Sequence, residues 1–186
     1  MFIFGHLGIG LRLVRPISAR KGRRDEKIRL PIRWILLGTL LPDLIDKSLF
    51  YGLLIAVGRE RASGSFISGT RTFGHAAIFT ILVTAIAAWR RSRVLAALSL
   101  GMASHLLLDN VGDRIVLGRE NFSLRGLLWP FAGVRFPVFP YHSLAGQLHR
   151  ATEPFYFWAE LLGFFLLIPE IWPYIQRGPI KRWMKF

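Results

Sequence analysis

Apolar stretches alternate with compact basic clusters along most of the chain, and this alternation predicts a bundle of helices. The first apolar stretch covers residues 2–14 and leads into a basic region at 15–33. The second runs from Trp34 to Asp46, and a shorter apolar piece follows at 48–57. Because these stretches lack the strict alternation of a half-buried strand, we predict helices.

A second pair of apolar stretches has the same layout. From His75 the chain is apolar to Trp89, turns at the basic residues 90–93, and returns through residues 94–108. Each pair therefore predicts an antiparallel hairpin with its basic residues at the turn. Pro42 is expected to end or kink the helix in which it lies.

The remainder of the chain divides into a cap and a last helix. Residues 112–154 contain many Gly, Pro and aromatic residues without a sustained period, which indicates a structured cap. Residues 155–175 are apolar with aromatic residues at both ends, as interfacial belts require. We predict one all-α, integral-membrane domain of four to five short helices: a bundle at 1–111, the cap at 112–154, and a C-terminal transmembrane helix with a basic tail at 155–186.

Composition supports a membrane location. The chain is 52% hydrophobic but only 19% charged, whereas a soluble domain carries about 25% charged residues. A wholly soluble helical protein is the alternative. The net charge of +14 suits either nucleic acid or anionic lipid head groups. Apolar stretches between the basic clusters favour a bilayer with anionic head groups as the partner over nucleic acid. The absence of cysteine excludes disulfides and Cys-ligated zinc.

Basic residues also predict an orientation. The region 15–33, the turn at 90–93 and the tail after 175 all fall on one side of the bundle, which the positive-inside rule makes cytoplasmic. Several Arg residues, among them Arg71 and Arg114, lie on the opposite side. We expect a multi-pass protein of a bacterial or archaeal inner membrane.

Six titratable residues interrupt the apolar pattern at the other end of the predicted hairpins. Charged and imidazole groups in apolar membrane sequence are expensive and mark functional sites. Asp43 and Asp46 are three residues apart, and His105 and Asp109 are four apart, so each pair shares a helix face. Mixed imidazole and carboxylate ligands suit Zn²⁺ best, with Mn²⁺ or Fe²⁺ as alternatives and calcium less suitable. The candidate ligands to one or two divalent ions are His6, Asp43, Asp46, His75, His105 and Asp109.

Each polar residue also has a simpler interpretation. A lone His on an apolar helix is usually a core residue, and Asp46 can cap a helix or pair with Lys47. Arg71, one helical turn before His75, can bind an anionic substrate group or a lipid phosphate. His142 and His149 are additional ligands, proton donors or surface residues. Glu160 is a buried acid or an interhelical hydrogen-bond partner.

The order and spacing of several short motifs resemble one family over residues 1–135. They are Gly5-His6, Leu41-Pro42-Asp43 with Asp46, Arg71 with His75, Ser104-His105 with Asp109, and Trp129-Pro130. The family is the LexA-regulated, inner-membrane-associated group of membrane-bound metal-dependent hydrolases. Its third motif usually reads His-Arg-Gly-x-Thr-His-Ser, whereas this chain has Thr70-Arg71-Thr72-Phe73-Gly74-His75-Ala76. The resemblance implies a metal site to which this motif contributes His75 alone.

These features lead to three functional hypotheses. The first is a metal-dependent hydrolase acting on a phosphoester or lipid-like substrate at the membrane interface, with Arg71 and Asp46 as candidate catalytic residues. The second is a non-catalytic membrane protein whose metal serves structure or sensing. The third is an adaptor that binds nucleic acid or a partner through the basic region 15–33.

Overall fold

The computed structural model describes most of the chain as helix and connecting loop. The described residues are 3–18, 30–58, 67, 69–121, 124–136, 149 and 152–177. Three predicted features lie outside them: His142, the basic residues between 19 and 29, and the tail beyond residue 177.

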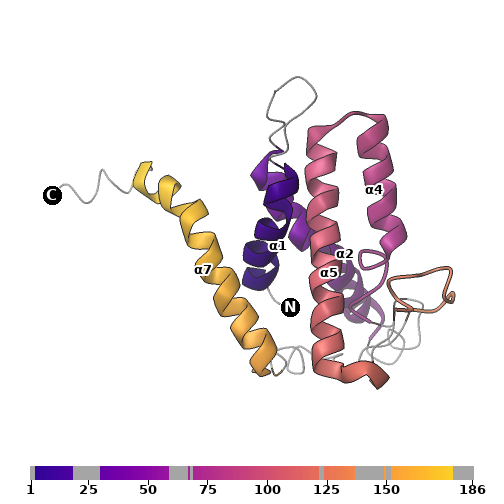
Figure 1. The fold of residues 1–186 in the computed structure, drawn as a ribbon. Coiled ribbons are helices and arrows are strands. Elements are labelled where there is room, and N and C mark those ends of the chain that lie inside the picture. Colours follow the sequence, from indigo (N-terminus) through magenta and orange to yellow (C-terminus); the bar gives the residue numbers. More distant parts are fainter. Residues whose placement is uncertain are drawn as a thin grey trace.

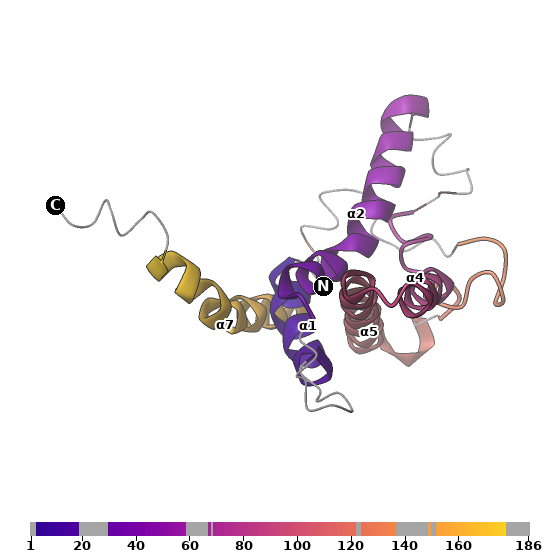
Figure 2. The ribbon, with the colours of Figure 1, turned by 90° about the horizontal axis from the view of Figure 1, so that it is seen from above.

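Five helices form the described part of the chain, which contains no strand. Their bounds are α1 Ile3–Ser18, α2 Ile32–Val57, α4 Ala77–Trp89, α5 Arg93–Asn121 and α7 Pro154–Arg177. The predicted all-α class is confirmed. Figures 1 and 2 show α4 and α5 as an antiparallel hairpin, with α2 crossing behind α5 and α7 beside α1.

The core between the first two helices shows that they are antiparallel, as predicted. Leu11 and Val14, late in α1, pack with Ile35, early in α2, and with Ala97 of α5. Van der Waals contact between these side chains holds the three helices together at this end. The opposite end of the same helices carries the predicted polar residues.

Glycines let α2 and α5 approach closely enough to bring that polar end together. A Cβ on Gly38 would lie 2.3 Å from the carbonyl oxygen of Leu98, and one on Gly101 would lie 2.3 Å from that of Ile35. Small residues at membrane helix interfaces allow this backbone-to-backbone packing. As a result Thr39 and the following turn of α2 lie next to His105.

Helix α7 runs parallel to α1 and is held to it along its length. The Glu160 carboxylate accepts hydrogen bonds from the amides of Phe4 (2.8 Å) and Gly5 (3.0 Å). One turn further on, a Cβ on Gly8 would lie 1.9 Å from the carbonyl oxygen of Gly163. Glu160 is therefore an interhelical hydrogen-bond partner, the second of the two predicted roles.

The far end of this helix pair is closed by ion pairs. The guanidinium of Arg15 is hydrogen-bonded to Glu170, and that of Arg12 donates to the carbonyl oxygen of Leu166 at 3.1 Å. Contacts therefore continue in the same order along both helices, which sets their parallel register.

Two helices are longer than the sequence pattern predicts. Helix α2 continues through Pro42 and includes the apolar piece 48–57. Helix α5 continues past residue 111 to Asn121, with a non-helical residue at Gly118, so the first part of the predicted cap is helical. The apolar pattern of a helix is interrupted beyond Asn110, because the inward-facing position 113 is an Asp and not an apolar residue. Asp113 is buried and is hydrogen-bonded to Arg71 and Tyr156.

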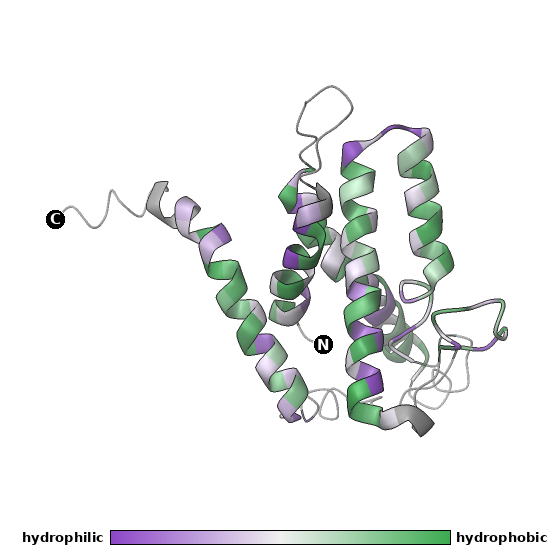
Figure 3. Cartoon of the chain, viewed as in Figure 1, coloured by the Kyte–Doolittle hydropathy of each residue, from purple (hydrophilic) through white to green (hydrophobic). Residues whose placement is uncertain are grey.

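Two of the helices are long and apolar enough to cross a membrane by length and composition. They are Arg93–Gly118 in α5 and Pro154–Pro173 in α7, and α4 is a shorter apolar helix. The predicted C-terminal transmembrane helix is confirmed. Figure 3 shows hydrophilic positions interrupting the hydrophobic surface on the half of α5 that leads to its C-terminal end. Those positions belong to the site described next.

Candidate metal centre

His75 and His105 form the centre of a buried polar cluster. His75 lies in the loop just before α4, and His105 lies in the middle of α5. Their Nε2 atoms face each other at 3.2 Å, and the side chains are 6% and 0% exposed. Two elements that are far apart in sequence thus deliver imidazole nitrogens to one point.

Each of these rings is oriented by an acceptor at its other nitrogen. The Nδ1 atom of His105 lies 2.7 Å from the carbonyl oxygen of Thr39, and Nδ1 of His75 lies 2.7 Å from Asp46. Because both partners are acceptors, Nδ1 carries the proton in each ring. When the rings are neutral, both Nε2 atoms present a lone pair to the same point, as ligating histidines do.

The Asp46 carboxylate holds the loop that carries His75. It accepts hydrogen bonds from the backbone N–H groups of Thr72 (2.6 Å), Gly74 (2.8 Å) and His75 (3.2 Å). It also accepts bonds from the Thr72 hydroxyl and from the His75 ring. Asp46 is fully buried, and each of its oxygens already has at least two donors. Its predicted pairing with Lys47 is not formed.

Asp43 stands at the more open edge of the cluster. Its Oδ1 lies 3.6 Å from Nε2 of His75, while its Oδ2 accepts a 2.6 Å hydrogen bond from Lys47. The side chain of Asp43 is 20% exposed and that of Lys47 is 36% exposed. The ion pair leaves one carboxylate oxygen directed at the imidazole.

Asp109 connects the cluster to a buried ion-pair network. Its Oδ2 lies 3.4 Å from Nε2 of His75 and 2.5 Å from the guanidinium of Arg71. Arg71 is also hydrogen-bonded to Asp113, which accepts a 3.2 Å hydrogen bond from the hydroxyl of Tyr156. A helix of the C-terminal part of the chain therefore contacts the network directly.

The charges of the two loop residues are set by these neighbours. Burial alone would lower the pKa of Arg71, but the carboxylates of Asp109 and Asp113 outweigh it and raise that pKa above its ordinary value. Burial would likewise lower the pKa of His75, and its hydrogen bonds to Asp109 and Asp46 raise it instead. The cluster thus stabilises positive charge next to its carboxylates.

His6 closes the other side of the cluster. Its ring stacks on that of His105 with centroids 3.9 Å apart, and its Nε2 lies 3.2 Å from Oδ1 of Asp109. Among the described residues, neither ring nitrogen of His6 has a hydrogen-bond partner of good geometry. An unsatisfied buried nitrogen is costly, and a cation would supply the missing partner.

Among the described residues, two overlapping groups could hold a metal ion, and within each group the candidate ligand atoms lie within 4.8 Å of one another. One is Asp43, His75 and His105, and the other is His6, His105 and Asp109. Ligand atoms of a tetrahedral zinc site with bonds of about 2.0–2.1 Å are separated by about 3.3 Å. The 3.2 Å separation of the two imidazole nitrogens and the 3.6 Å separation of Asp43 from His75 are close to this spacing.

The predicted site residues divide into candidate ligands and residues that support them. Five of them belong to one or other ligand set, whereas Asp46 belongs to neither and supports His75. Arg71 pairs with carboxylates of the network. His149 is exposed. Asp113 was not among the predicted site residues, although it continues the four-residue spacing of His105 and Asp109 by one more turn.

The fold and the cluster together define an all-α membrane protein with a buried His/Asp site. A family model described as YdjM inner membrane protein matches residues 1–175. The chain therefore belongs to the YdjM inner membrane protein family. The match includes every candidate ligand and extends to the last helix, beyond the residues that carried the resemblance in the sequence. The predicted inner-membrane location is confirmed.

No curated protein and no solved structure gives a significant match to the chain.

Proposed function

We propose that Asp43, His75 and His105 bind one divalent metal ion. The observation that carries this proposal is the pair of Nε2 atoms 3.2 Å apart, which both present a lone pair to the same point when the two rings are neutral. Two such lone pairs repel unless a proton or a cation lies between them. The acceptors at Thr39 and Asp46 hold a proton on Nδ1 of each ring, so the point between the Nε2 atoms is open to a second proton on His75 or to a cation. Asp43, whose Oδ1 lies 3.6 Å from Nε2 of His75, supplies the third ligand that a cation would use.

The ligand chemistry supports zinc first, with manganese or iron as alternatives. Two imidazoles and one carboxylate are typical of transition-metal sites, and three protein ligands leave a position for water or substrate. The Nε2 atom of His105 has one lone pair, so the two overlapping ligand sets cannot each use it. A second ion would be left with His6 and Asp109 from the described residues.

We infer further that the site hydrolyses a phosphoester at the membrane interface. A bound divalent ion lowers the pKa of water and polarises a phosphoryl oxygen. Asp43 and Lys47 lie at the exposed edge, where the ammonium group attracts an anionic substrate. Arg71 holds Asp109 against the imidazoles, and Asp46 holds His75. In this proposal Arg71 and Asp46 are positioning residues, because their charged groups are already engaged.

The burial of the cluster favours a second candidate, a metal that serves structure or sensing. His6 and His105 are fully buried, and Asp109 is 3% exposed. A structural site is closed, whereas a catalytic one keeps an open position. In this second case the ion ties α2, α5 and the loop before α4 together.

Metal analysis of the detergent-purified protein tests the site itself. We expect about one zinc, manganese or iron ion per chain in the wild type and almost none in His105→Ala. The control is His149→Ala, which removes an exposed imidazole outside the cluster and leaves the metal content unchanged. A wild-type protein that contains no metal and acquires none on dialysis against zinc overturns both candidates.

A second pair of measurements separates the enzyme from the structural site. If the site is catalytic, wild-type protein hydrolyses bis(4-nitrophenyl) phosphate in mixed micelles, His105→Ala loses turnover, and chelation of the wild type abolishes turnover without changing its thermal midpoint. If it is structural, chelation of the wild type lowers the thermal midpoint and no hydrolysis depends on His105.

A further inference from the structure

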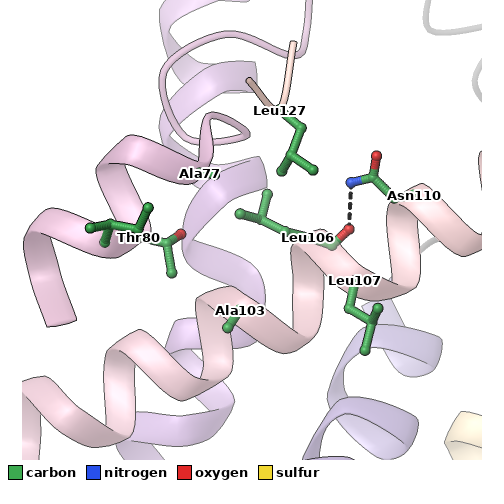
Figure 4. Close-up of a pocket in the computed structure, with 8 residues that line it drawn as sticks. Ala77, Thr80, Ala103, Leu106, Leu107, Asn110 and Leu127 are labelled. Carbon is green, nitrogen blue, oxygen red and sulfur yellow. Dashed lines mark hydrogen bonds between the residues drawn. The ribbon is translucent and has the colours of Figure 1, made fainter. Parts of the chain in front are cut away.

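A separate apolar groove lies between α4 and α5, away from the metal ligands. It has a volume of about 300 Å³. Figure 4 shows side chains from both helices and from the loop at Leu127 around it. Residues that line it include Ala77, Thr80, Ile81, Ala103, Leu106 and Leu127. The groove is large enough for part of one hydrocarbon chain.

The groove contains one buried hydroxyl that has no partner. Thr80 is 8% exposed, and its Oγ1 makes no hydrogen bond among the described residues. In Figure 4 this oxygen is on the side of Thr80 that faces Leu106 across the groove. An unsatisfied hydroxyl in an apolar setting costs about 1–3 kcal/mol. A bound group with an acceptor would remove that cost.

Other polar groups near the groove are already satisfied. The amide of Asn110 donates to the carbonyl oxygen of Leu106 at 2.7 Å. The carbonyl oxygen of Leu127 accepts a 2.8 Å hydrogen bond from the amide of Ala77. A ligand here therefore meets a hydrocarbon surface and a single donor, a combination that excludes charged or highly polar molecules.

The groove opens beside a candidate membrane span, among exposed apolar side chains. Helix α5 is a candidate membrane span, and the neighbouring side chains of Ile81 and Leu107 are 64% and 56% exposed. Thr80 lies three residues after the start of α4, or roughly 5 Å along the helix axis. That start adjoins the polar loop with His75, and if this polar loop lies at the membrane interface, Thr80 is at the level where the ester carbonyls of glycerolipids meet the hydrocarbon.

We propose that this groove binds one acyl chain of a diacyl glycerolipid, whose ester carbonyl accepts a hydrogen bond from Thr80. The site does not depend on the proposed metal chemistry. Ala103 and Leu107 are one turn apart on one face of α5, whereas His105 and Asp109 lie on another face. Loss of metal binding and loss of lipid binding are thus independent results.

Native mass spectrometry of the full chain, titrated with defined lipids, tests the proposal. The probes are dioleoyl phosphatidylglycerol and its dialkyl ether analogue, which lacks both ester carbonyls. For wild type we expect the diester to bind about three- to tenfold more tightly than the diether, as one net hydrogen bond allows. Thr80→Val should remove this preference by weakening diester binding alone.

A further variant, with two controls, tests the groove itself. Ala103→Phe fills the groove and should lower the binding of both lipids at least tenfold. The controls are Thr84→Val, which removes a hydroxyl that donates to the Thr80 carbonyl oxygen, and Ala85→Phe, on an exposed part of α4 outside the groove. Both should bind both lipids as wild type does.

The proposal is overturned if Ala103→Phe binds lipid as well as wild type, or if wild type does not distinguish diester from diether. Equal losses for both lipids in Thr80→Val also overturn the ester contact. Thermal unfolding of each variant identifies a folding defect, and in that case Ala103→Leu, a smaller substitution at the same wall, replaces the phenylalanine variant.

Discussion

His75 and His105 direct their Nε2 atoms at each other across 3.2 Å, although they are thirty positions apart and come from different elements. Each ring is hydrogen-bonded through its Nδ1 atom, His105 to the carbonyl oxygen of Thr39 and His75 to Asp46. Burying two imidazole nitrogens that face each other as acceptors is unfavourable, and folded proteins avoid it unless a proton or a cation lies between the two nitrogens. The first two predictions concern the groups that maintain it.

Asp46 and Asp43 are expected to respond differently to the same substitution. Asp46→Asn replaces acceptor oxygens that face N–H and O–H donors, and it should lower the free energy of unfolding by about 3 kcal/mol. It should also weaken metal binding about 10- to 100-fold, as changes to groups that orient ligands do. Thermal unfolding and chelator competition measure the two effects.

Asp43→Asn is the matched comparison for this prediction. Asp43 is partly exposed and holds no loop, so its loss should reduce metal binding while the unfolding free energy changes little. If Asp46→Asn were as stable as wild type, the loop 72–75 would not depend on that carboxylate.

Arg71 should be essential for stability because it neutralises two buried carboxylates. Arg71→Gln leaves Asp109 and Asp113 uncompensated, and we expect a loss of about 3–5 kcal/mol in unfolding free energy. Adding Asp113→Asn to this variant should recover part of the loss. The control is Arg90→Gln, an exposed residue over the ring of Trp89, with a cost below about 1 kcal/mol. A larger loss in the control than at Arg71 would contradict the network.

The contact of α1 with α7 should tolerate no added methyl group. A Cβ at Gly8 would meet the Gly163 carbonyl oxygen at 1.9 Å, so Gly8→Ala forces the helices apart at a cost of about 1–3 kcal/mol. Gly52→Ala is the matched control, because no atom lies within 4 Å of the added Cβ in α2. In Gly52→Ala the higher helix propensity of alanine should raise the free energy of unfolding by up to about 1 kcal/mol. Equal thermal midpoints for the two variants would refute the close approach.

The stability of the start of α1 should depend on how many acceptor oxygens the side chain at position 160 provides. It binds the amides of Phe4 and Gly5, so Glu160→Gln keeps one acceptor oxygen and Glu160→Ala keeps none. We expect successive losses of about 1 kcal/mol each. Hydrogen exchange at the first turn of α1 should quicken in the same order. Identical exchange in all three proteins would show that the cap does not hold this helix end.

The sequence predicts the hairpins and the end at which their ligands meet, because helix direction and position along each stretch follow from hydrophobic periodicity. It cannot separate Asp43 from Asp46, which share a face of α2 and differ in which loop covers them. The loop 72–75 wraps Asp46 through backbone N–H groups, and backbone donors leave no mark in the sequence.

The parallel docking of α7 on α1 was equally inaccessible. It rests on the contact of Gly8 with Gly163 and on hydrogen bonds made by isolated Glu and Arg side chains. The partners in each bond are more than 150 positions apart, so they cannot be matched without the register of the two helices. Asp113 was within reach, because its spacing from Asp109 repeats that of Asp109 from His105. Its polar neighbours instead indicated the end of a helix.

The cap on α1 also has a temporal consequence. Gly5 and Glu160 are 155 positions apart, and His6 follows Gly5 directly. During translation His6 is synthesised long before Glu160, whose carboxylate binds the first amides of α1. The hydrogen bonds that hold the start of α1, next to His6, can therefore form only after α7 has been synthesised.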